Sequence, residues 1–242
     1  MGDVTEQALY LADHYAKEFE AEVLSAKDGK YVVLSKTLFY PASGGQPNDT
    51  GTLETEDGRK FNVVFAIKAG NNISHEVEPE GLKEGDKVKG KIDWGRRYTL
   101  MRMHTAAHIL SSVFHKEAGA LITGNQLGTD KSRIDFSLDD FDREKIGEYT
   151  NKANELIKLD KQVKVSFVSR EEAMKIPGVM KLAGPALPPK IKTWRLLEIE
   201  DIDLQADGGT HVASTSEVGG VKVVKIENKG KNNRRVYFEL VD

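Results

Sequence analysis

Residues 96–118 constrain the fold of this chain more than any other stretch, because they contain neither glycine nor proline. An uninterrupted stretch of this length predicts an α-helix of several turns. Within it, His104 and His108 are four residues apart, so their imidazoles lie one turn apart on the same helix face. Ala106 and Ala107 between them keep the helix slim at that point. Two imidazoles at this spacing can both reach one metal ion.

A second pattern supplies candidates for the remaining metal ligands. Asp207 and His211 are also four residues apart, and the glycines between them let the backbone turn sharply and approach a ligand closely. Neutral imidazole suits zinc, and zinc also accepts a carboxylate oxygen. The two patterns together predict a zinc site with four ligands: His104, His108, Asp207 and His211.

The alternative is that these histidines have structural roles only. Two histidines four apart on a helix are, by themselves, more typical of packed or solvated side chains, and only the second pattern favours a metal. His115 lies near the same helix face but about 10 Å from His108 along the axis, at 1.5 Å per residue. It cannot share a metal with the pair, so we interpret it as structural.

Composition excludes several classes of protein. The 242 residues carry a net charge of −3, whereas a general nucleic-acid coat is usually basic. The absence of cysteine rules out a disulfide framework and fits a reducing, cytoplasmic location. No apolar run approaches about 18 residues, so no membrane span is expected. The N-terminal residues do not have the pattern of a secretory signal, and no feature indicates an obligatory protein partner.

The order of the patterns predicts an α+β protein with two parts. In residues 1–90, short alternating segments separated by glycine-bearing turns indicate a small β-barrel or sandwich. Its strands are expected at residues 19–26, 31–38, 51–54, 60–68, 73–77 and 87–94. Residues 91–242 mix helices and strands, which predicts an antiparallel sheet with helices on one face. Here helices are expected at residues 94–117 and 141–159, strands at 132–138, 163–168, 191–200, 221–228 and 234–240, and a loop at 180–190.

A glycine-containing loop precedes the third expected strand. Ser43, Gly44, Gly45 and Gln46 could present successive backbone N–H groups to an anion or a carbonyl oxygen. An ordinary turn is the alternative, and the residues alone favour it.

Three segments together resemble the alanyl-tRNA editing proteins, free-standing relatives of the editing domain of alanyl-tRNA synthetase. They occur in the family's order: FYPASGGQPNDTG at residues 39–51, DWGRR through MRMHTAAH at residues 93–108, and QADGGTHV at residues 205–212. The length resembles that of the medium-sized class, which has an N-terminal β-barrel followed by an editing domain. The resemblance therefore implies a barrel domain at residues 1–90 and a zinc-binding editing domain at residues 91–242.

The resemblance also implies an activity. By resemblance, the expected reaction is metal-dependent hydrolysis of the ester that joins a wrong amino acid to the 3′ end of tRNA(Ala), with serine as the expected amino acid and glycine as a second candidate. It implies zinc at His104, His108 and His211. The chain departs from the common family pattern at Asp207, where cysteine is usual, and a hard oxygen there favours weaker zinc binding, another divalent metal, or a place outside the ligand shell. We retain Asp207 as a ligand.

The catalytic and substrate-binding residues are also implied by resemblance. Thr123 stands at the position of a family threonine that faces the substrate, with an ordinary strand hydroxyl as the alternative, and we expect it and Gln46 to act in catalysis. Ser43, Gly44, Gly45, Gln46 and Thr123 are expected to bind substrate, because the loop reaches the editing site in the family.

Cationic residues are candidates for contacts with tRNA phosphates. They are Arg96, Arg97, Arg102, Lys225, Lys229, Lys231, Arg234 and Arg235. Two rival functions remain open at this point. One is a related editing hydrolase for threonyl-tRNA, which the glycine-containing loop and the barrel disfavour. The other is a non-catalytic tRNA-binding module in which Asp207 marks the loss of the metal.

Overall fold

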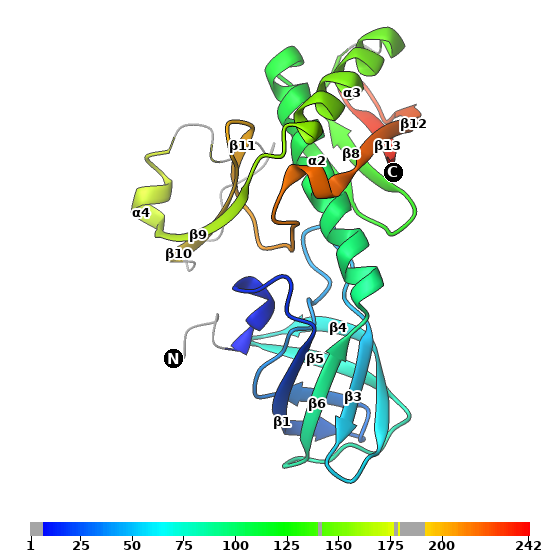
Figure 1. Ribbon diagram of the computed structural model, residues 1–242, viewed down its shortest axis with the longest axis vertical. Helices are drawn as coiled ribbons and strands as arrows, with labels where there is room; N and C mark the ends of the chain where they lie inside the picture. The colour runs from blue at the N-terminus through cyan, green and yellow to red at the C-terminus, as the bar shows by residue number, and fades with distance from the viewer. Residues whose placement is uncertain (1–6, 140–141, 177–178, 180–191) are drawn as a thin grey trace. The chain divides into compact units, whose positions relative to one another are not determined.

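The computed structural model describes residues 7–139, 142–176, 179 and 192–242. The chain divides into two compact units, Met1–Thr99 and Leu100–Asp242. The N-terminal unit contains a closed barrel in which every strand pairs antiparallel with its neighbours (Figure 1). In barrel order its strands are β1 (Glu18–Lys27), β2 (Tyr31–Leu34), β5 (Asn72–Glu78), β4 (Lys60–Ala69), β3 (Gly51–Thr55) and β6 (Lys87–Ile92). A short 3-10 helix, η1 (Leu9–Leu11), precedes them.

The barrel follows from the alternation in the sequence. Successive side chains of a strand point to opposite faces, and in β2 the buried positions are Val32 and Leu34. In β6, Gly90 lies opposite Phe19 of β1, and a Cβ at this position would come within 2.3 Å of the Phe19 ring. The glycine therefore makes room for an aromatic ring in the barrel core. Closure leaves the sheet without an exposed edge.

One barrel residue is a fully buried histidine. The His75 ring lies between two neutral partners, the Thr37 hydroxyl at 2.9 Å from Nε2 and the Val32 carbonyl at 3.2 Å from Nδ1. Burial lowers the pKa of His75 from 6.5 to about 4, although the bond to Val32 favours the charged form.

The stability of the protein should therefore fall in mild acid. The unfolded chain takes up a proton at His75 near pH 6.5, whereas the folded barrel resists protonation until about pH 4. The stabilisation that the neutral His75 ring contributes to the fold is thus fully present above pH 6.5 and is lost as the pH falls towards 4. Between pH 7.5 and 4.5, wild type should lose roughly 2–3 kcal/mol more unfolding free energy than His75→Gln, which does not titrate. Urea unfolding at the two pH values measures this, and equal losses would contradict the assignment.

Helix α2 (Trp94–Ala118) confirms the long helix expected from the glycine-free stretch. Its first turn is tied to the barrel by Arg97, whose side chain is fully buried. The guanidinium pairs with the Asp49 carboxylate and also donates to the carbonyls of Leu38 and His14. The expectation that Arg97 contacts phosphate is wrong, because the guanidinium has no exposed surface and already has protein partners.

The second unit contains two antiparallel sheets. One has the order β11 (Asp203–Ala206), β10 (Thr193–Ile199) and β9 (Val163–Ser169). The other has the order β12 (Gly220–Asn228), β13 (Arg234–Val241), β8 (Ser132–Phe136) and β7 (Ile122–Gln126). The helices besides α2 are α3 (Arg143–Lys158), α4 (Arg170–Ala173) and the 3-10 helix η2 (Thr215–Val218). The α+β class is confirmed, with two sheets where a single one was expected.

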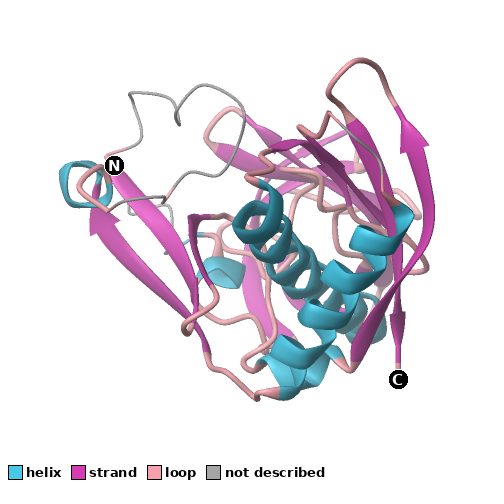
Figure 2. Ribbon diagram, turned by 90° about the horizontal axis from the view of Figure 1, so that it is seen from above, coloured by secondary structure: helices cyan, strands magenta, loops and turns pink. Residues whose placement is uncertain are grey.

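Helices α2 and α3 pack beside the four-stranded sheet (Figure 2). Phe114 of α2 stacks on Phe136 of β8 with ring centroids 4.4 Å apart, and Tyr149 of α3 meets Phe114 edge-on at 5.2 Å. Helix α3 begins after Asp142, whose side chain accepts hydrogen bonds from the backbone N–H groups of Glu144 and Lys145. These contacts fix α2 within the second unit.

The expected strands and helices in the described residues are present, with ends shifted by a few residues. Strand β11 was not expected, since it has four residues and lies within a polar segment. The expected loop at residues 180–190 lies outside the described residues. No described helix is long and apolar enough to cross a membrane.

Candidate metal centre

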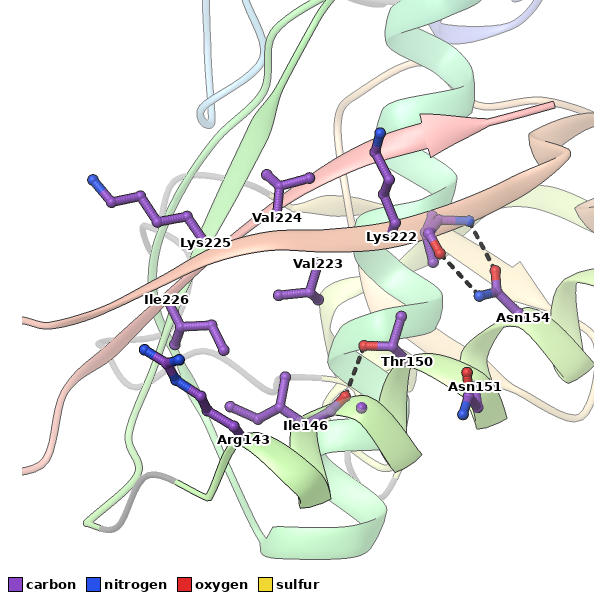
Figure 3. Close-up of a pocket in the computed structure, with 12 residues that line it drawn as sticks. Arg143, Ile146, Thr150, Asn151, Asn154, Lys222, Val223, Val224, Lys225 and Ile226 are labelled. Atoms are coloured by element: carbon purple, nitrogen blue, oxygen red, sulfur yellow. Dashed lines mark hydrogen bonds between the residues drawn. The ribbon is translucent and has the colours of Figure 1, made fainter.

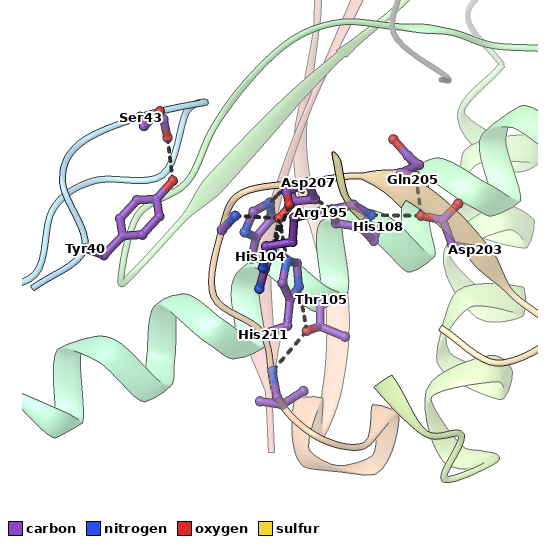
Figure 4. Close-up of polar contacts among 12 residues, drawn as sticks. Tyr40, Ser43, His104, Thr105, His108, Arg195, Asp203, Gln205, Asp207 and His211 are labelled. Carbon is purple, nitrogen blue, oxygen red and sulfur yellow. Dashed lines mark hydrogen bonds and ion pairs between the residues drawn. The ribbon is translucent and has the colours of Figure 1, made fainter. Parts of the chain in front are cut away.

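The four residues expected to bind zinc come together in the second unit (Figure 4). Helix α2 contributes His104 and His108 on one face, and the turn after β11 contributes Asp207 and His211. One ligand atom from each residue lies within 4.8 Å of those of the other three. The two pairs of residues, each spaced four apart in the sequence, therefore form a single cluster.

The Asp207 carboxylate is the centre of this cluster. Its Oδ1 lies 2.9 Å from His211 Nε2, and its Oδ2 lies 3.5 Å from His104 Nε2 and 3.7 Å from His108 Nε2. Oδ1 also accepts a hydrogen bond from the backbone N–H of Gly209 at 2.6 Å, which holds the turn in place. All three imidazoles thus direct the same ring nitrogen, Nε2, towards one carboxylate.

Two of the three histidines also have a partner on Nδ1, the ring nitrogen that points away from Asp207. Asp203 Oδ2 lies 2.8 Å from His108 Nδ1, and the Thr105 hydroxyl lies 3.2 Å from His211 Nδ1. Thr105 follows His104 directly on α2 and is fully buried. These contacts orient two of the three rings before any ligand binds.

Burial and charge give the cluster a defined protonation pattern. Burial lowers the pKa of His104 to about 4 against the attraction of Asp207, and it lowers the pKa of His211 well below its usual value. For His108, burial acts in the same direction, but the Asp203 and Asp207 carboxylates outweigh it and raise the pKa to about 9. Burial opposes charge on Asp207, yet the surrounding histidines bring its pKa well below 3.8. At neutral pH the cluster therefore has two neutral imidazoles, one imidazolium and one carboxylate.

This donor set fits a divalent metal. A tetrahedral zinc ion with bonds of about 2.0–2.1 Å places its ligand atoms roughly 3.4 Å apart, close to the separations around Asp207. Two imidazoles are already neutral donors, and the proton on His108 is one that a metal ion would displace. Three nitrogens and one oxygen suit zinc, although an oxygen in place of a thiolate is a harder ligand.

A buried arginine adjoins the cluster. Arg195 of β10 donates to the backbone carbonyl of Asp207 at 2.8 Å, and its guanidinium lies 3.7 Å from Asp207 Oδ1. It fixes the turn and places a permanent positive charge beside the carboxylate. This cation also contributes to the low pKa of His104.

Comparison with known proteins identifies the family. An alanyl-tRNA editing protein AlaX-M of Methanosarcina barkeri is 54% identical over 98% of this chain and 99% of its own length. The AlaX-M protein of Saccharolobus solfataricus is 46% identical over 97% of this chain and 98% of its own length. The chain belongs to the alanyl-tRNA editing protein family. The alanine–tRNA ligase of Pyrococcus abyssi is 39% identical over 96% of this chain but only 25% of the ligase.

Two family models match separate parts of this editing protein. Residues 3–96 match class II (A) tRNA synthetases, and residues 194–237 match the second additional domain of threonyl and alanyl tRNA synthetases. The second match includes Asp207 and His211 of the cluster.

The glycine-containing loop of the editing protein is a tight turn in the barrel unit. Ser43 and Gln46 exchange two backbone hydrogen bonds, and Gly44 and Gly45 both have positive φ, of 58° and 87°. Two central residues with positive φ define a type I′ turn, which glycine adopts without strain. The Tyr40 hydroxyl donates to the Ser43 carbonyl at 3.1 Å (Figure 4). Within the described residues, the N–H groups of Gly44 and Gly45 make no hydrogen bond. The substrate-binding role of the loop stays a prediction.

Thr123 lies on β7 and is exposed. Its hydroxyl donates to the Asn233 side-chain oxygen at 3.1 Å. No hydrogen bond among the described residues joins Thr123 to the histidine cluster. Its proposed role therefore rests on the resemblance alone.

Several of the cations expected to contact phosphate are used within the fold. Arg102 donates to the Val218 carbonyl and pairs with Asp242, while Arg235 makes a two-point ion pair with Asp135. Arg234 is buried and bonds to the carbonyl of Gly230. Arg96 donates to the Asn48 carbonyl at 3.0 Å. Lys225, Lys229 and Lys231 are exposed, and their phosphate contacts stay predictions.

A hollow of about 780 Å³ lies between α3 and β12 (Figure 3). Its walls include Arg143, Lys222 and Lys225, of which Lys222 pairs with Glu239 and Lys225 pairs with Glu227. None of the four cluster residues lines it, so this hollow is separate from the candidate metal centre.

Sequence patterns did not single out the residues that support the four side chains of the cluster. Asp203 and Gln205 alternate with Leu204 and Ala206, and this period of two predicts a strand with one polar face. That pattern, ending at Asp207, was the signal for β11. Thr105 and Arg195 had no comparable signal, because a single threonine in a helix or arginine in a strand is common.

Proposed function

We propose that this chain is a trans-editing hydrolase that removes serine from mischarged tRNA(Ala), using zinc bound by His104, His108, Asp207 and His211. The observation that carries this proposal is the buried cluster of three imidazoles and one carboxylate. Full-length relatives named as alanyl-tRNA editing proteins support the substrate class. Glycyl-tRNA(Ala) is a second expected substrate, and a cytoplasmic location remains expected.

The reaction breaks the ester between the amino-acid carbonyl and the ribose of the terminal nucleotide, with water as the attacking group. When bound, zinc supplies Lewis acidity that lowers the pKa of water or polarises the carbonyl, and it can position the substrate. The chain's own contribution is to hold the Nε2 donors in a buried site and to keep Arg195 beside them. A fixed positive charge in a poorly hydrated site favours the negative charge that develops on the carbonyl oxygen.

Asp207 makes this centre chemically distinct from one with a thiolate at the same position. A carboxylate retains the single negative charge of a thiolate, so the charge of the centre is unchanged. Its harder oxygen binds zinc less selectively against other divalent ions. We therefore expect zinc in the native protein, and activity also with Co²⁺ or Mn²⁺ after exchange.

The substrate class is tested by comparing aminoacyl esters on their cognate or mischarged tRNA. The protein should release serine from seryl-tRNA(Ala), release glycine more slowly, and leave alanyl-tRNA(Ala) intact. Rapid cleavage of seryl-tRNA(Thr) with no cleavage of seryl-tRNA(Ala) would instead support the threonyl-type editing hydrolase. Cleavage of none of these, with tRNA binding retained, would support the non-catalytic module.

Thr123→Val tests the proposed recognition of the serine hydroxyl. A site that hydrogen-bonds a substrate hydroxyl can reject the analogue that lacks it by about 10⁴-fold. The valine variant, which keeps the shape of threonine without its hydroxyl, should reduce the preference for the seryl over the alanyl ester by at least about tenfold. The ratio of kcat/KM for the two esters is the measurement. Asn233→Ala, which removes the partner of Thr123, is the control for an indirect effect, and unchanged selectivity in Thr123→Val would remove this residue from the pocket.

A further inference from the structure

Strand β11 and the residue after it present three polar side chains in alternation. Asp203, Gln205 and Asp207 occupy every second position, and alternate residues of a strand share a face. Leu204 and Ala206, in between, pack with the hydrophobic cluster around Trp194. The polar face turns towards the histidines: Asp207 faces their Nε2 atoms, and Asp203 contacts the far side of His108 (Figure 4).

We propose that Asp203 is a positioning residue for metal binding. It keeps a proton on His108 Nδ1, so that the metal-bound ring is the tautomer whose Nε2 lone pair is directed at the metal position. Gln205 in turn holds Asp203. This inference rests on the metal centre of the proposed function, and it assigns a role to two residues outside the ligand set.

The tautomer follows from the chemistry of the contact. A neutral imidazole has one protonated and one unprotonated nitrogen, and only the unprotonated nitrogen can bind a metal. An ionised carboxylate only accepts hydrogen bonds. Because Asp203 Oδ2 lies 2.8 Å from His108 Nδ1, Nδ1 keeps its proton, and the proton that a metal ion displaces is the one on Nε2, which then becomes the donor atom.

The Asp203 carboxylate is itself held in place. Its side chain has no exposed surface, and the same Oδ2 accepts a hydrogen bond from Gln205 Nε2 at 2.9 Å. Gln205 is only 5% exposed. A buried carboxylate with two donors on one oxygen has little freedom to turn away, so His108 is oriented before the metal arrives.

The contact on His211 differs in one respect. Its Nδ1 lies 3.2 Å from the Thr105 hydroxyl, and a hydroxyl can either donate or accept. That contact is compatible with both tautomers of His211. Asp203 therefore imposes on His108 a constraint that Thr105 does not impose on His211.

A purely structural role for Asp203 is the competing explanation. Ser112 lies one turn after His108 on α2, and its hydroxyl donates to the carbonyl of Ile202, the residue before Asp203. The Asp203–His108 and Ser112–Ile202 contacts thus both connect residues 202–203 to helix α2. If Asp203 were only a link between these segments, its loss should resemble the loss of Ser112.

The experiment compares Asp203→Asn and Asp203→Ala with the matched control Ser112→Ala. Competition with a chelator of known affinity gives the dissociation constant for Zn²⁺ alone, and thermal unfolding of the metal-free proteins reports the structural contribution. Loss of a carboxylate behind a metal-binding histidine typically costs 10–100-fold in metal affinity. We expect about tenfold weaker binding for Asp203→Asn, up to about 100-fold for Asp203→Ala, and less than about twofold for Ser112→Ala.

Nitrogen-15 NMR of the Zn²⁺-loaded wild type adds a spectroscopic signature. The His108 ring should have a slowly exchanging proton on Nδ1 and none on Nε2, and that proton should exchange rapidly in Asp203→Ala. Asp203→Asn, which can keep an acceptor oxygen at this position, should retain the proton in part.

The outcomes separate this inference from the proposed function. Zn²⁺ affinity that is unchanged in both Asp203 variants, or reduced equally in Ser112→Ala, overturns the positioning role while leaving the metal centre intact. A wild-type protein that binds no Zn²⁺ overturns the metal centre and the positioning role together. Selective loss of affinity in the Asp203 variants, with the predicted Nδ1 proton in wild type, supports both.

Discussion

Replacing His108 with alanine should abolish both metal retention and hydrolysis. His108 is the histidine that contacts both acidic residues of the centre, Asp203 at 2.8 Å and Asp207 at 3.7 Å. Its removal deletes one proposed ligand and leaves the buried Asp203 carboxylate without its imidazole partner. Zinc contributes several kcal/mol of transition-state stabilisation in such sites, so the seryl ester should be cleaved at least about 10³-fold more slowly. Metal content after desalting and single-turnover cleavage are the measurements.

His115→Ala is the matched control for this prediction. His115 lies on the same helix, outside the cluster, and its Nδ1 is 3.1 Å from the carbonyl of Ala120. This variant should retain the metal and activity within about threefold of wild type. Because an uncompensated carboxylate can destabilise the fold, His104→Gln provides a second test of the same ligand set. Full activity in a metal-free His108→Ala protein would contradict the account.

Among the substitutions proposed for this protein, Asp49→Ala should lower the free energy of unfolding the most. Asp49 and Arg97 form an ion pair in which neither side chain has any exposed surface. The carboxylate also accepts a hydrogen bond from the backbone N–H of Tyr40 at 2.7 Å. Asp49→Ala leaves a guanidinium buried without its counter-charge, which typically costs about 3–5 kcal/mol. Chemical unfolding at pH 7.5 measures the difference.

The chain offers two controls for the buried pair. Glu54→Ala breaks an exposed pair with Lys60, at 3.4 Å, and should cost less than about 1 kcal/mol. The double variant Arg97→Met with Asp49→Leu removes both charges and should be more stable than Asp49→Ala. A loss below about 1 kcal/mol in Asp49→Ala would show that the ion pair does not hold the start of α2.

The sequence predicted the clustering of the four candidate ligands better than it predicted their surroundings. The spacing of His104 and His108 needs only a helix to become a shared face, and the long stretch without glycine or proline made that helix a firm expectation. The Asp207 and His211 spacing needs only a tight turn. Both patterns are local, so neighbouring residues were sufficient to predict each half of the cluster, and the fold brings the two halves together.

The supporting residues depend on contacts between segments distant in the chain. Asp203 meets His108 across 95 residues, and Arg97 meets Asp49 across 48. A cation near the start of a helix opposes the helix dipole, which is why Arg97 was expected to serve a phosphate partner, with a solvated surface as the alternative. Its burial is decided by a carboxylate from a barrel loop, and no local pattern reports that.

The division of the second unit into two sheets has a similar cause. Strands β9 and β10 pair through seven positions and β11 pairs with β10 on its other side, whereas β13 pairs with β12 on one side and with β8 on the other. Alternation predicts that a segment is a strand, but pairing partners are chosen by the packing of the whole unit. The expected strands were therefore present, while their arrangement followed from the fold.

Release of serine from seryl-tRNA(Ala), before and after removal of the metal by a chelator, tests the central claim most directly. We predict cleavage by the protein as isolated, loss of cleavage after chelation, and recovery on addition of one equivalent of Zn²⁺, with alanyl-tRNA(Ala) intact throughout. Undiminished cleavage by protein shown to contain no metal would contradict the proposed role of His104, His108, Asp207 and His211.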